Sequence, residues 1–317
     1  MAVKVGVKEA VELTGKNFDF FINSFDSILV DCDGVLWHGN KPIKGAATTL
    51  KKFRDLGKKV FFITNNSTKT RDEFLNKFHA LQFEATIDEI FSTSYAAAIY
   101  LRNLHFKQKV YVVGSKGIGQ ELDLVKIRHI GVGPDILKGN IIDLINDGIE
   151  LDPEVRAVIV GFDEHFSYPK ILRAASYLND PNCAFIATNT DERFPVESEN
   201  PIVMPGSGSL LAAVKVAAQR EPLVLGKPTP YMLDAICSVH NIDRSRSLMI
   251  GDRLNTDILM GVNCGIGTLL VLTGISTLEE VQENRNSSKV DDQKLVPDYF
   301  VDSLGSLEKF MRIDFHF

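Results

Sequence analysis

SILVDCDGV, residues 27–35, is an apolar run that ends in two acidic residues and a glycine. Alternate residues of a strand point to the same side, so we expect Asp31 and Asp33 to face one crevice, while Gly34 lets the chain turn sharply away. At a separation of ~5 Å and an effective dielectric constant of about 20, two carboxylates repel by roughly 3 kcal/mol. The pair therefore requires a cation in the same site, unless one acid stays protonated.

Further short apolar runs have the same form and are bounded by polar or glycine-containing turns. They cover residues 59–64, 109–114, 156–161, 183–188, 247–252 and 267–273. Amphipathic stretches lie between them, at residues 45–56, 70–81, 169–178, 208–219, 229–240 and 255–263. This alternation predicts βαβ units with a buried parallel sheet, and hence an α/β fold. The polar segment 283–294 could be a mobile surface loop, although a plain exposed connection is the simpler interpretation.

Small polar residues follow the second predicted strand. Thr64, Asn65 and Asn66 offer hydroxyl, amide and backbone donors that suit an oxyanion, although such a run can also cap a helix. Further along the chain, Gly226-Lys227-Pro228 precedes a helix that we expect to begin near Thr229. Proline fits the first turn of a helix and glycine permits close approach, which leaves Lys227 as a fixed point charge. Alone, this lysine could equally be a solvated surface charge.

A further strand ends in GDRLNTD, residues 251–257. Asp252 is expected at the tip of the strand and Asp257 in the opening turn of the next helix. Each of these motifs has a purely structural alternative, as a turn or a helix cap. Together, the four motifs supply the polar residues that a site for a phosphoryl group needs, and each motif follows an apolar strand. At the carboxyl ends of an open α/β sheet, these groups meet where ligands bind.

DCDGV, TNNS, GKP and GDRLNTD, in this order, resemble the four motifs of the haloacid dehalogenase (HAD)-type phosphatases. Other stretches narrow the resemblance to the branch of phosphoglycolate, 4-nitrophenyl and pyridoxal phosphate phosphatases, with animal phosphoglycolate phosphatase nearest. They are GFDEHFSY (161–168), ATNTDERFP (187–195), PGSGSL (205–210) and VPDYFVDS (296–303). The resemblance covers nearly the whole chain beyond the first twenty or so residues. It implies a Rossmann-like parallel-sheet core.

The resemblance also implies roles for individual residues. Asp31 would be the nucleophile that forms an aspartyl-phosphate, and Asp33 the general acid and base. Mg²⁺ would be bound by the carboxylates of Asp31 and Asp252 and by the backbone carbonyl of Asp33, with Asp257 holding a metal-bound water. The residues expected to contact the oxygens of the transferred phosphoryl group are Thr64, Asn65, Asn66 and Lys227.

The interval between Ser67 and Gly226 is far longer than the ~30 residues that one βα unit and its return require. We therefore expect an inserted α/β domain at residues 106–221, within a catalytic core formed by residues 1–105 and 222–317. The insert resembles the large C2-type cap of this phosphatase branch. Such a cap excludes water and contacts the leaving group, so substrate choice should reside there.

ATNTDERFP is the candidate loop for contacting the leaving group. Arg193 could donate to the carboxylate of a substrate such as 2-phosphoglycolate, or it could simply pair with a surface acid. Phe194 stands where relatives vary, and its bulk could admit a different leaving group. The sequence therefore leaves the substrate open within the branch.

The composition limits the partners. Thirty-five Lys and Arg against forty-one Asp and Glu give a net charge of −6, which offers no global attraction to nucleic acid or anionic membrane. The cysteines Cys32, Cys183, Cys237 and Cys264 are too widely spaced to indicate zinc or disulfides, so a reducing, cytoplasmic location fits best. Cys32 is expected to be a core residue, although a redox switch between the two acids is possible.

The leading hypothesis is a Mg²⁺-dependent phosphomonoesterase that hydrolyses 2-phosphoglycolate. Alternatives within the class are pyridoxal phosphate, glycerol 3-phosphate or a broad set of 4-nitrophenyl-type substrates. A different class is a catalytically silent phosphate-binding regulatory protein, which would usually have lost Asp31 or Asp33. The family resemblance also suggests a homodimer formed through the caps.

Overall fold

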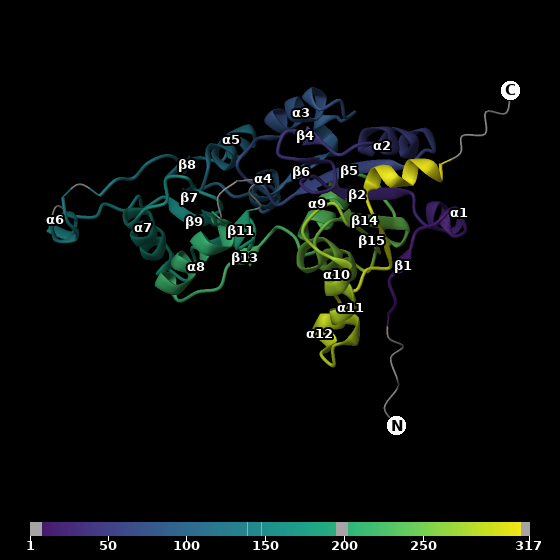
Figure 1. Cartoon of the computed structure of the whole chain (residues 1–317). Helices are drawn as coiled ribbons and strands as arrows, with labels where there is room; N and C mark the ends of the chain where they lie inside the picture. The colour runs from purple at the N-terminus through teal and green to yellow at the C-terminus, as the bar shows by residue number, and fades with distance from the viewer. Residues whose placement is uncertain (1–7, 138, 147, 195–201, 312–317) are drawn as a thin grey trace. The chain divides into compact units, whose positions relative to one another are not determined.

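The computed structural model describes residues 8–137, 139–146, 148–194 and 202–311, and the chain forms two compact units (Figure 1). Unit 1 comprises residues 1–64, 75–91 and 227–317, and unit 2 comprises residues 65–74 and 92–226. Residues 65–74, 92–105 and 222–226, which were expected in the core, group with unit 2. The functional division into a catalytic core and a cap stays a prediction.

Unit 1 contains a seven-stranded sheet, and its pairings from β1 to β5 are all parallel. In spatial order the strands are β1 (Val11–Glu12), β16 (Tyr299–Val301), β15 (Gly267–Val271), β14 (Ser247–Gly251), β2 (Ser27–Asp31), β5 (Lys59–Thr64) and β6 (Ile90–Ser92). Every residue of β2 and β14 is buried, as the apolar runs predict. The α/β fold expected from the sequence is therefore confirmed.

The order of the strands reverses between β2 and β14. From β2 the chain continues to β5 and β6 on one side, and from β14 it continues to β15 and β16 on the other. In open α/β sheets such a switch point leaves a crevice beyond the carboxyl ends of the two central strands. Asp31 ends β2 and Asp252 directly follows β14, so both acids lie at this crevice.

Helices and a short hairpin complete unit 1 (Figure 1). They are α1 (Phe18–Asn23), β3 (Trp37–His38), β4 (Lys41–Pro42), α2 (Ala46–Asp55), the last part of α3 (Arg71–Ala80), α9 (Tyr231–Val239), α10 (Leu259–Cys264), α11 (Leu278–Asn286) and α12 (Val290–Gln293). Irregular turns are η1 (Ile87–Glu89), η2 (Arg244–Arg246), the π-helical η3 (Leu254–Ile258) and η4 (Leu304–Lys309).

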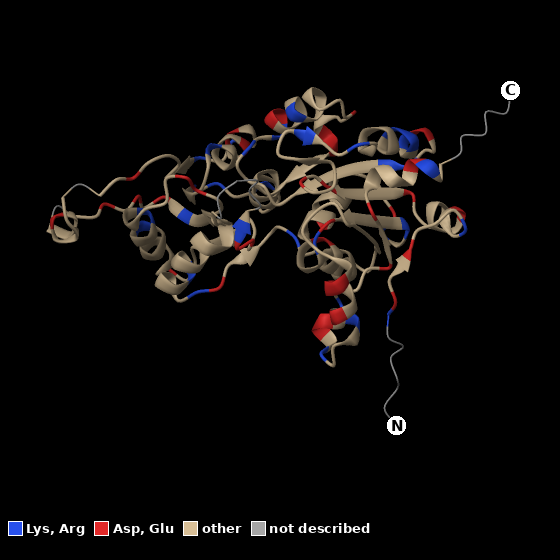
Figure 2. Cartoon of the chain, viewed as in Figure 1, with Lys and Arg blue, Asp and Glu red and all other residues tan. Residues whose placement is uncertain are grey.

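The interpretation of residues 283–294 as a mobile loop or a plain exposed connection is wrong. Most of this segment belongs to α11 and α12, which carry acidic residues along much of their length (Figure 2). A capping box begins α11: Thr277 Oγ1 accepts from the backbone N–H of Glu280, and Glu280 Oε2 accepts from that of Thr277. Val281 is buried and anchors the helix. Local capping and one buried contact therefore outweigh the polar composition.

Unit 2 contains a second parallel sheet with the order β13 (Leu223–Val224), β10 (Ala184–Ala187), β9 (Val155–Val160), β7 (Lys109–Val113) and β8 (His129–Ile130). Strands β11 (Arg193–Phe194) and β12 (Met204–Pro205) pair with each other in antiparallel orientation. The helices are α4 (Thr93–Asn103), α5 (Lys116–Leu124), α6 (Ile141–Asn146), α7 (Tyr168–Leu178) and α8 (Ser207–Ala218). One core cluster packs side chains of α7 and α8 on β7, β9 and β10.

Basic and acidic residues are interspersed along the ribbons of both units (Figure 2). This distribution agrees with a mildly acidic chain that relies on local chemistry to hold an anion. Among the described residues, no helix is both long and apolar enough to cross a bilayer. The cytoplasmic location stays a prediction.

Candidate active site

Three buried acids and one buried lysine gather at the switch point of unit 1. Asp31, Asp252 and Asp257 each offer a carboxylate oxygen, and these oxygens lie within 4.8 Å of one another. We call these residues the acidic cluster. Lys227 Nζ forms an ion pair with Asp31 Oδ1 and a second one, of 2.7 Å, with Asp257 Oδ1. The side chain of Lys227 is only 3% exposed, so it is not a solvated surface charge.

The π-helical turn η3 aims Asp257 back at the end of β14. Asp257 Oδ2 accepts hydrogen bonds from the backbone N–H groups of Asp252 at 3.2 Å and Arg253 at 3.1 Å. Its other oxygen faces Lys227. A turn of this kind is rare in proteins and frequent at functional sites. The sequence motif alone does not reveal it.

Two glycines make room for the carboxylate of Asp252. A Cβ on Gly34, whose φ is +84°, would lie 2.4 Å from Asp252 Oδ2, and one on Gly274 would lie 1.8 Å from it. The same oxygen accepts from the backbone N–H of Ile275 at 2.9 Å. Thr273 Oγ1 donates to the carbonyl of Gly34 at 2.6 Å and holds the turn after β2 in place. Side chains larger than hydrogen at the two glycines would displace Asp252.

Burial and mutual repulsion shape the electrostatics of the acidic cluster. Burial raises the pKa of Asp31 well above its ordinary value; Lys227 opposes this shift, while Asp257 and Asp252 add to it. Burial, followed by the charge of Asp257, raises the pKa of Asp252 to about 7. Burial alone would lower the pKa of Lys227, but the carboxylates of Asp257 and Asp31 outweigh it and raise that pKa. The cluster therefore combines a protonated lysine with acids whose ionisation favours a further cation.

The acidic cluster found among the described residues does not include Asp33. Asp33 Oδ1 accepts from Trp37 Nε1 at 2.8 Å and lies 3.8 Å from Lys77 Nζ, and the side chain of Asp33 is 43% exposed. Alternation along a strand holds only while the strand continues, and β2 ends at Asp31. Lys77 also lies over the ring of Trp37, at 4.2 Å from its centroid. No sequence motif marks this lysine, so its position beside Asp33 could not be predicted.

The residues after β5 make specific polar contacts. Thr64 ends the strand and is buried. Asn65 Nδ2 donates to Asp191 Oδ2 at 2.7 Å, and Asn66 Oδ1 accepts from the backbone N–H of Thr68 at 2.9 Å. The segment does not cap α3, because Thr70 performs that role with Glu73.

The remaining predicted residues are placed as follows. Arg193 is exposed and Phe194 half-buried on β11, where the Phe194 ring lies 5.0 Å from that of Phe162. Pro195, which completes the ATNTDERFP stretch, lies outside the described residues. Helix α9 begins at Tyr231, so Pro228 is not in its first turn. The roles suggested for Arg193 and Phe194 in substrate choice stay predictions.

Cys32 is expected to resist modification in the folded protein. Its side chain is buried, and burial, followed by the charges of Asp31 and Asp33, raises its thiol pKa well above the ordinary value. The thiolate is the reactive form, so iodoacetamide at pH 8 should label Cys32 at least ~10-fold more slowly than in the unfolded chain. Peptide mass spectrometry after timed labelling measures this. Rapid labelling of native Cys32 would instead favour the redox-switch alternative.

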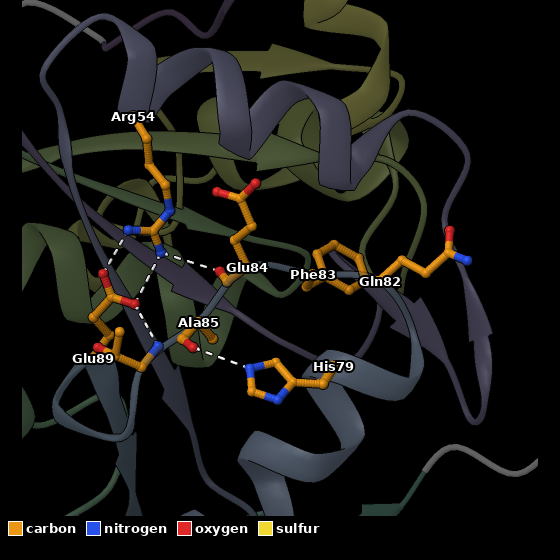
Figure 3. A pocket seen from close by; sticks show the side chains of 8 residues that line it. Arg54, His79, Gln82, Phe83, Glu84, Ala85 and Glu89 are labelled. Carbon is orange, nitrogen blue, oxygen red and sulfur yellow. Dashed lines mark hydrogen bonds and ion pairs between the residues drawn. The ribbon is translucent and has the colours of Figure 1, made fainter.

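A separate hollow of about 510 Å³ lies in unit 1 beside η1 (Figure 3). Arg54 and Glu89 form an ion pair in it: Arg54 donates to both oxygens of Glu89, at 2.5 and 3.0 Å, and to the carbonyl of Glu84 at 3.2 Å. His79 Nε2 lies 3.3 Å from the carbonyl of Ala85. None of the predicted site residues lines this hollow, and we assign no function to it.

Comparison with known proteins agrees with this geometry. Residues 28–128 match the model of the haloacid dehalogenase-like hydrolases, and residues 224–307 match a HAD-hydrolase-like model. The chain is 42% identical over 307 residues to the glycerol-3-phosphate phosphatase of Mus musculus, covering 94% of each chain. It is 42% identical to the 4-nitrophenylphosphatase of Schizosaccharomyces pombe, covering 92% of this chain and 96% of that one. It is 40% identical to the chloroplastic phosphoglycolate phosphatase 1A of Arabidopsis thaliana, and the match covers 92% of this chain and 78% of that one.

Solved structures show the same fold. The p-nitrophenyl phosphatase from Archaeoglobus fulgidus superposes with a TM-score of 0.75 at 26% identity, covering 90% of this chain and 99% of that one. A glycerol phosphate phosphatase from Mycobacterium tuberculosis, solved in complex with magnesium, gives a TM-score of 0.71 at 26% identity over 90% and 78%. The chain belongs to the haloacid dehalogenase-like hydrolase family. Within this family it is a phosphatase, a phosphoric monoester hydrolase, as the resemblance implied.

Proposed function

We propose that the chain is a Mg²⁺-dependent phosphomonoesterase that hydrolyses a small phosphorylated metabolite through an aspartyl-phosphate intermediate. The observation that carries this proposal is the acidic cluster with Lys227 at the switch point of the parallel sheet. A carboxylate nucleophile, hard oxygen ligands and a buried ammonium group are the parts that phosphoryl transfer requires.

Asp31 is the proposed nucleophile. One of its carboxylate oxygens attacks phosphorus, the bond to the substrate oxygen breaks, and the phosphoryl group stays on Asp31. Water then attacks the same phosphorus, which releases phosphate and regenerates the carboxylate. Lys227 would offset negative charge on the transferring group, and the uncharged donors after β5 would supply hydrogen bonds to its oxygens.

Asp33 is proposed to move the protons in both half-reactions. It would donate a proton to the leaving oxygen and then accept one from the attacking water. Both of its contacts described above use Oδ1, so Oδ2 is available to carry the proton. The hydrogen bond from Trp37 fixes the orientation of the carboxyl group.

Mg²⁺ fits the donor set of the acidic cluster, because carboxylate oxygens are its preferred protein ligands. The proposed ligands are the carboxylates of Asp31 and Asp252 and the backbone carbonyl of Asp33, with Asp257 acting through water. When bound, the ion would neutralise the clustered acids and the phosphoryl oxygens. The magnesium complex of the M. tuberculosis relative supports this choice.

Removal of divalent ions is expected to lower phosphatase activity at least ~100-fold, because the acids then lack their main counter-charge. Phosphate release is measured after dialysis against a chelator and again after addition of Mg²⁺, which should restore it. Ca²⁺ should restore much less, because it adopts larger and more flexible coordination. Full activity in the chelated protein would refute the metal assignment.

The proposed substrate is 2-phosphoglycolate, with glycerol 3-phosphate as the second candidate because of the mouse relative. Pyridoxal phosphate and 4-nitrophenyl phosphate are the further alternatives. A kcat/KM comparison over these four compounds tests the choice, and we expect at least a tenfold excess for one of the first two over 4-nitrophenyl phosphate. A protein that releases phosphate from none of them would instead be the silent binding protein. A cap-mediated homodimer, which light scattering can test, stays a prediction.

A further inference from the structure

A hydrogen-bond network in unit 2 joins the segment after β5 to the loop after β10. We call residues 188–194 the reading loop. Asp191 Oδ2 accepts from Asn65 Nδ2 at 2.7 Å and from Asn189 Nδ2 at 2.6 Å. Asn189 Oδ1 in turn accepts from Thr188 Oγ1 at 2.8 Å, and the side chains of both residues are inaccessible to solvent. One carboxylate oxygen thus holds two amide groups together.

The same network includes two of the four places where the chain passes between the units. Asn65 directly follows Thr64, and Gly226 directly precedes Lys227. The backbone N–H of Gly226 donates to the carbonyl of Thr188 at 2.7 Å, and Thr93 Oγ1 donates to the carbonyl of Asn65 at 2.8 Å. A Cβ on Gly226 would lie 2.5 Å from that Thr188 oxygen and 2.6 Å from Asn65 Oδ1. The reading loop is therefore packed against these two chain connections.

The other end of the reading loop is held by its backbone. The carbonyl of Asp191 accepts from the N–H of Gly208 at 2.8 Å, and the carbonyl of Glu192 accepts from the N–H of Gly206 at 2.7 Å. Glu192 also accepts from Ser209 Oγ at 2.8 Å. These bonds join the loop to the start of α8. The side chain of Asp191, in the middle of the loop, joins the loop to Asn65.

We propose that Asp191 is a positioning residue that fixes the reading loop against Asn65 and so determines which leaving groups the enzyme accepts. The inference rests on the proposed phosphatase function. Charge-assisted hydrogen bonds to a carboxylate are short and directional, so a single acid can set the position of a loop. Asp191 acts through Asn65 and Asn189, and no step of the reaction is assigned to it.

The kinetic test compares two substrates in variants of Asp191. Asp191→Ala should lower kcat/KM at least tenfold for the preferred small metabolite, mainly by raising KM, because leaving-group contacts from the loop are lost. Hydrolysis of 4-nitrophenyl phosphate, whose leaving group is already activated, should fall at least roughly threefold less than this, because it shares with the metabolite only the contact proposed between Asn65 and the phosphoryl group. Asp191→Asn keeps an oxygen that can accept from both amides, and should retain most of the wild-type preference.

Asp180→Ala is the matched control in unit 2. Asp180 Oδ1 also accepts from one asparagine, through the backbone N–H of Asn182 at 2.9 Å and its Nδ2 at 3.2 Å, but it lies outside the reading loop. This variant should leave the substrate preference unchanged. Asn189→Ala removes one donor and should shift the preference in the same direction as Asp191→Ala. Equal losses on both substrates in Asp191→Ala would assign a purely structural role and overturn the proposal.

Hydrogen exchange gives a readout that needs no activity. In Asp191→Ala, the amides of Gly206, Gly208 and Gly226 should exchange at least tenfold faster than in wild type, because their acceptors belong to the reading loop. The Asp180→Ala control should exchange at the wild-type rate. A wild-type protein that hydrolyses no substrate would refute the proposed function, and the exchange rates would still decide whether Asp191 positions the loop. Unchanged exchange in Asp191→Ala contradicts the proposal.

Discussion

Replacing Asp31 with asparagine is expected to lower kcat at least ~10³-fold, because an amide oxygen cannot serve as the nucleophile that forms the acyl phosphate. The amide would keep the size of the side chain at the end of β2. The substitution would also remove one of three crowded buried acids, while Lys227 would retain Asp257 as a partner. The folded state should therefore persist. Phosphate release at saturating Mg²⁺ and substrate measures the effect, and thermal unfolding checks the fold.

Asp26→Asn is the matched control for this experiment. Asp26 immediately precedes β2 at its opposite end, where its partly exposed carboxylate pairs with Arg246. Its neutralisation should leave kcat within about twofold of wild type, because the pair lies far along the strand from Asp31. Normal turnover in Asp31→Asn would exclude Asp31 as the nucleophile. Equal losses in both variants would show that charge removal, not the nucleophile, limits activity.

The sequence predicted the buried central strands of both sheets, because a strand that is covered on both faces consists almost entirely of apolar residues. The short strands β1, β6, β8, β13 and β16 were not predicted. Each predicted strand is present with its ends within two residues. The convergence of Asp31 and Asp252 could also be anticipated, because parallel strands place their carboxyl ends at one edge. Here the local pattern and the topology agree. Lys227 follows β13 of the other sheet, so only the family resemblance indicated its position.

Other features lie outside the patterns from which the fold was predicted. The direction of the Asp33 side chain is set by the end of β2 and by the hydrogen bond from Trp37. Helix α11, which runs into the 283–294 segment, begins at a capping box whose Thr277 lies before that segment. The bond between Asn65 and Asp191 spans 126 positions of the chain. Such long-range pairing is invisible in a single sequence, although both residues stand in stretches that the motifs single out.

Lys227→Met should destabilise the metal-free protein by about 3 kcal/mol, because it leaves buried carboxylates without their cation. Methionine keeps a similar unbranched stem, so the loss of stability reflects the missing charge more than a change in packing. Turnover should also fall roughly 10²–10³-fold, since the ammonium group is proposed to stabilise the transferring phosphoryl group. Chemical denaturation measures the stability and phosphate release the turnover.

The effect of Mg²⁺ on stability distinguishes the loss of the Lys227 charge from a general destabilisation of the core. In Lys227→Met the acidic cluster lacks its ammonium group, so added Mg²⁺ should raise the free energy of unfolding more than in wild type. Lys170→Met is the matched control: Lys170 is also fully buried and pairs with Asp163 at 2.5 Å in unit 2, outside the acidic cluster. It should lose stability with no added response to Mg²⁺. If both variants responded alike, the acids around Lys227 would not be the magnesium site.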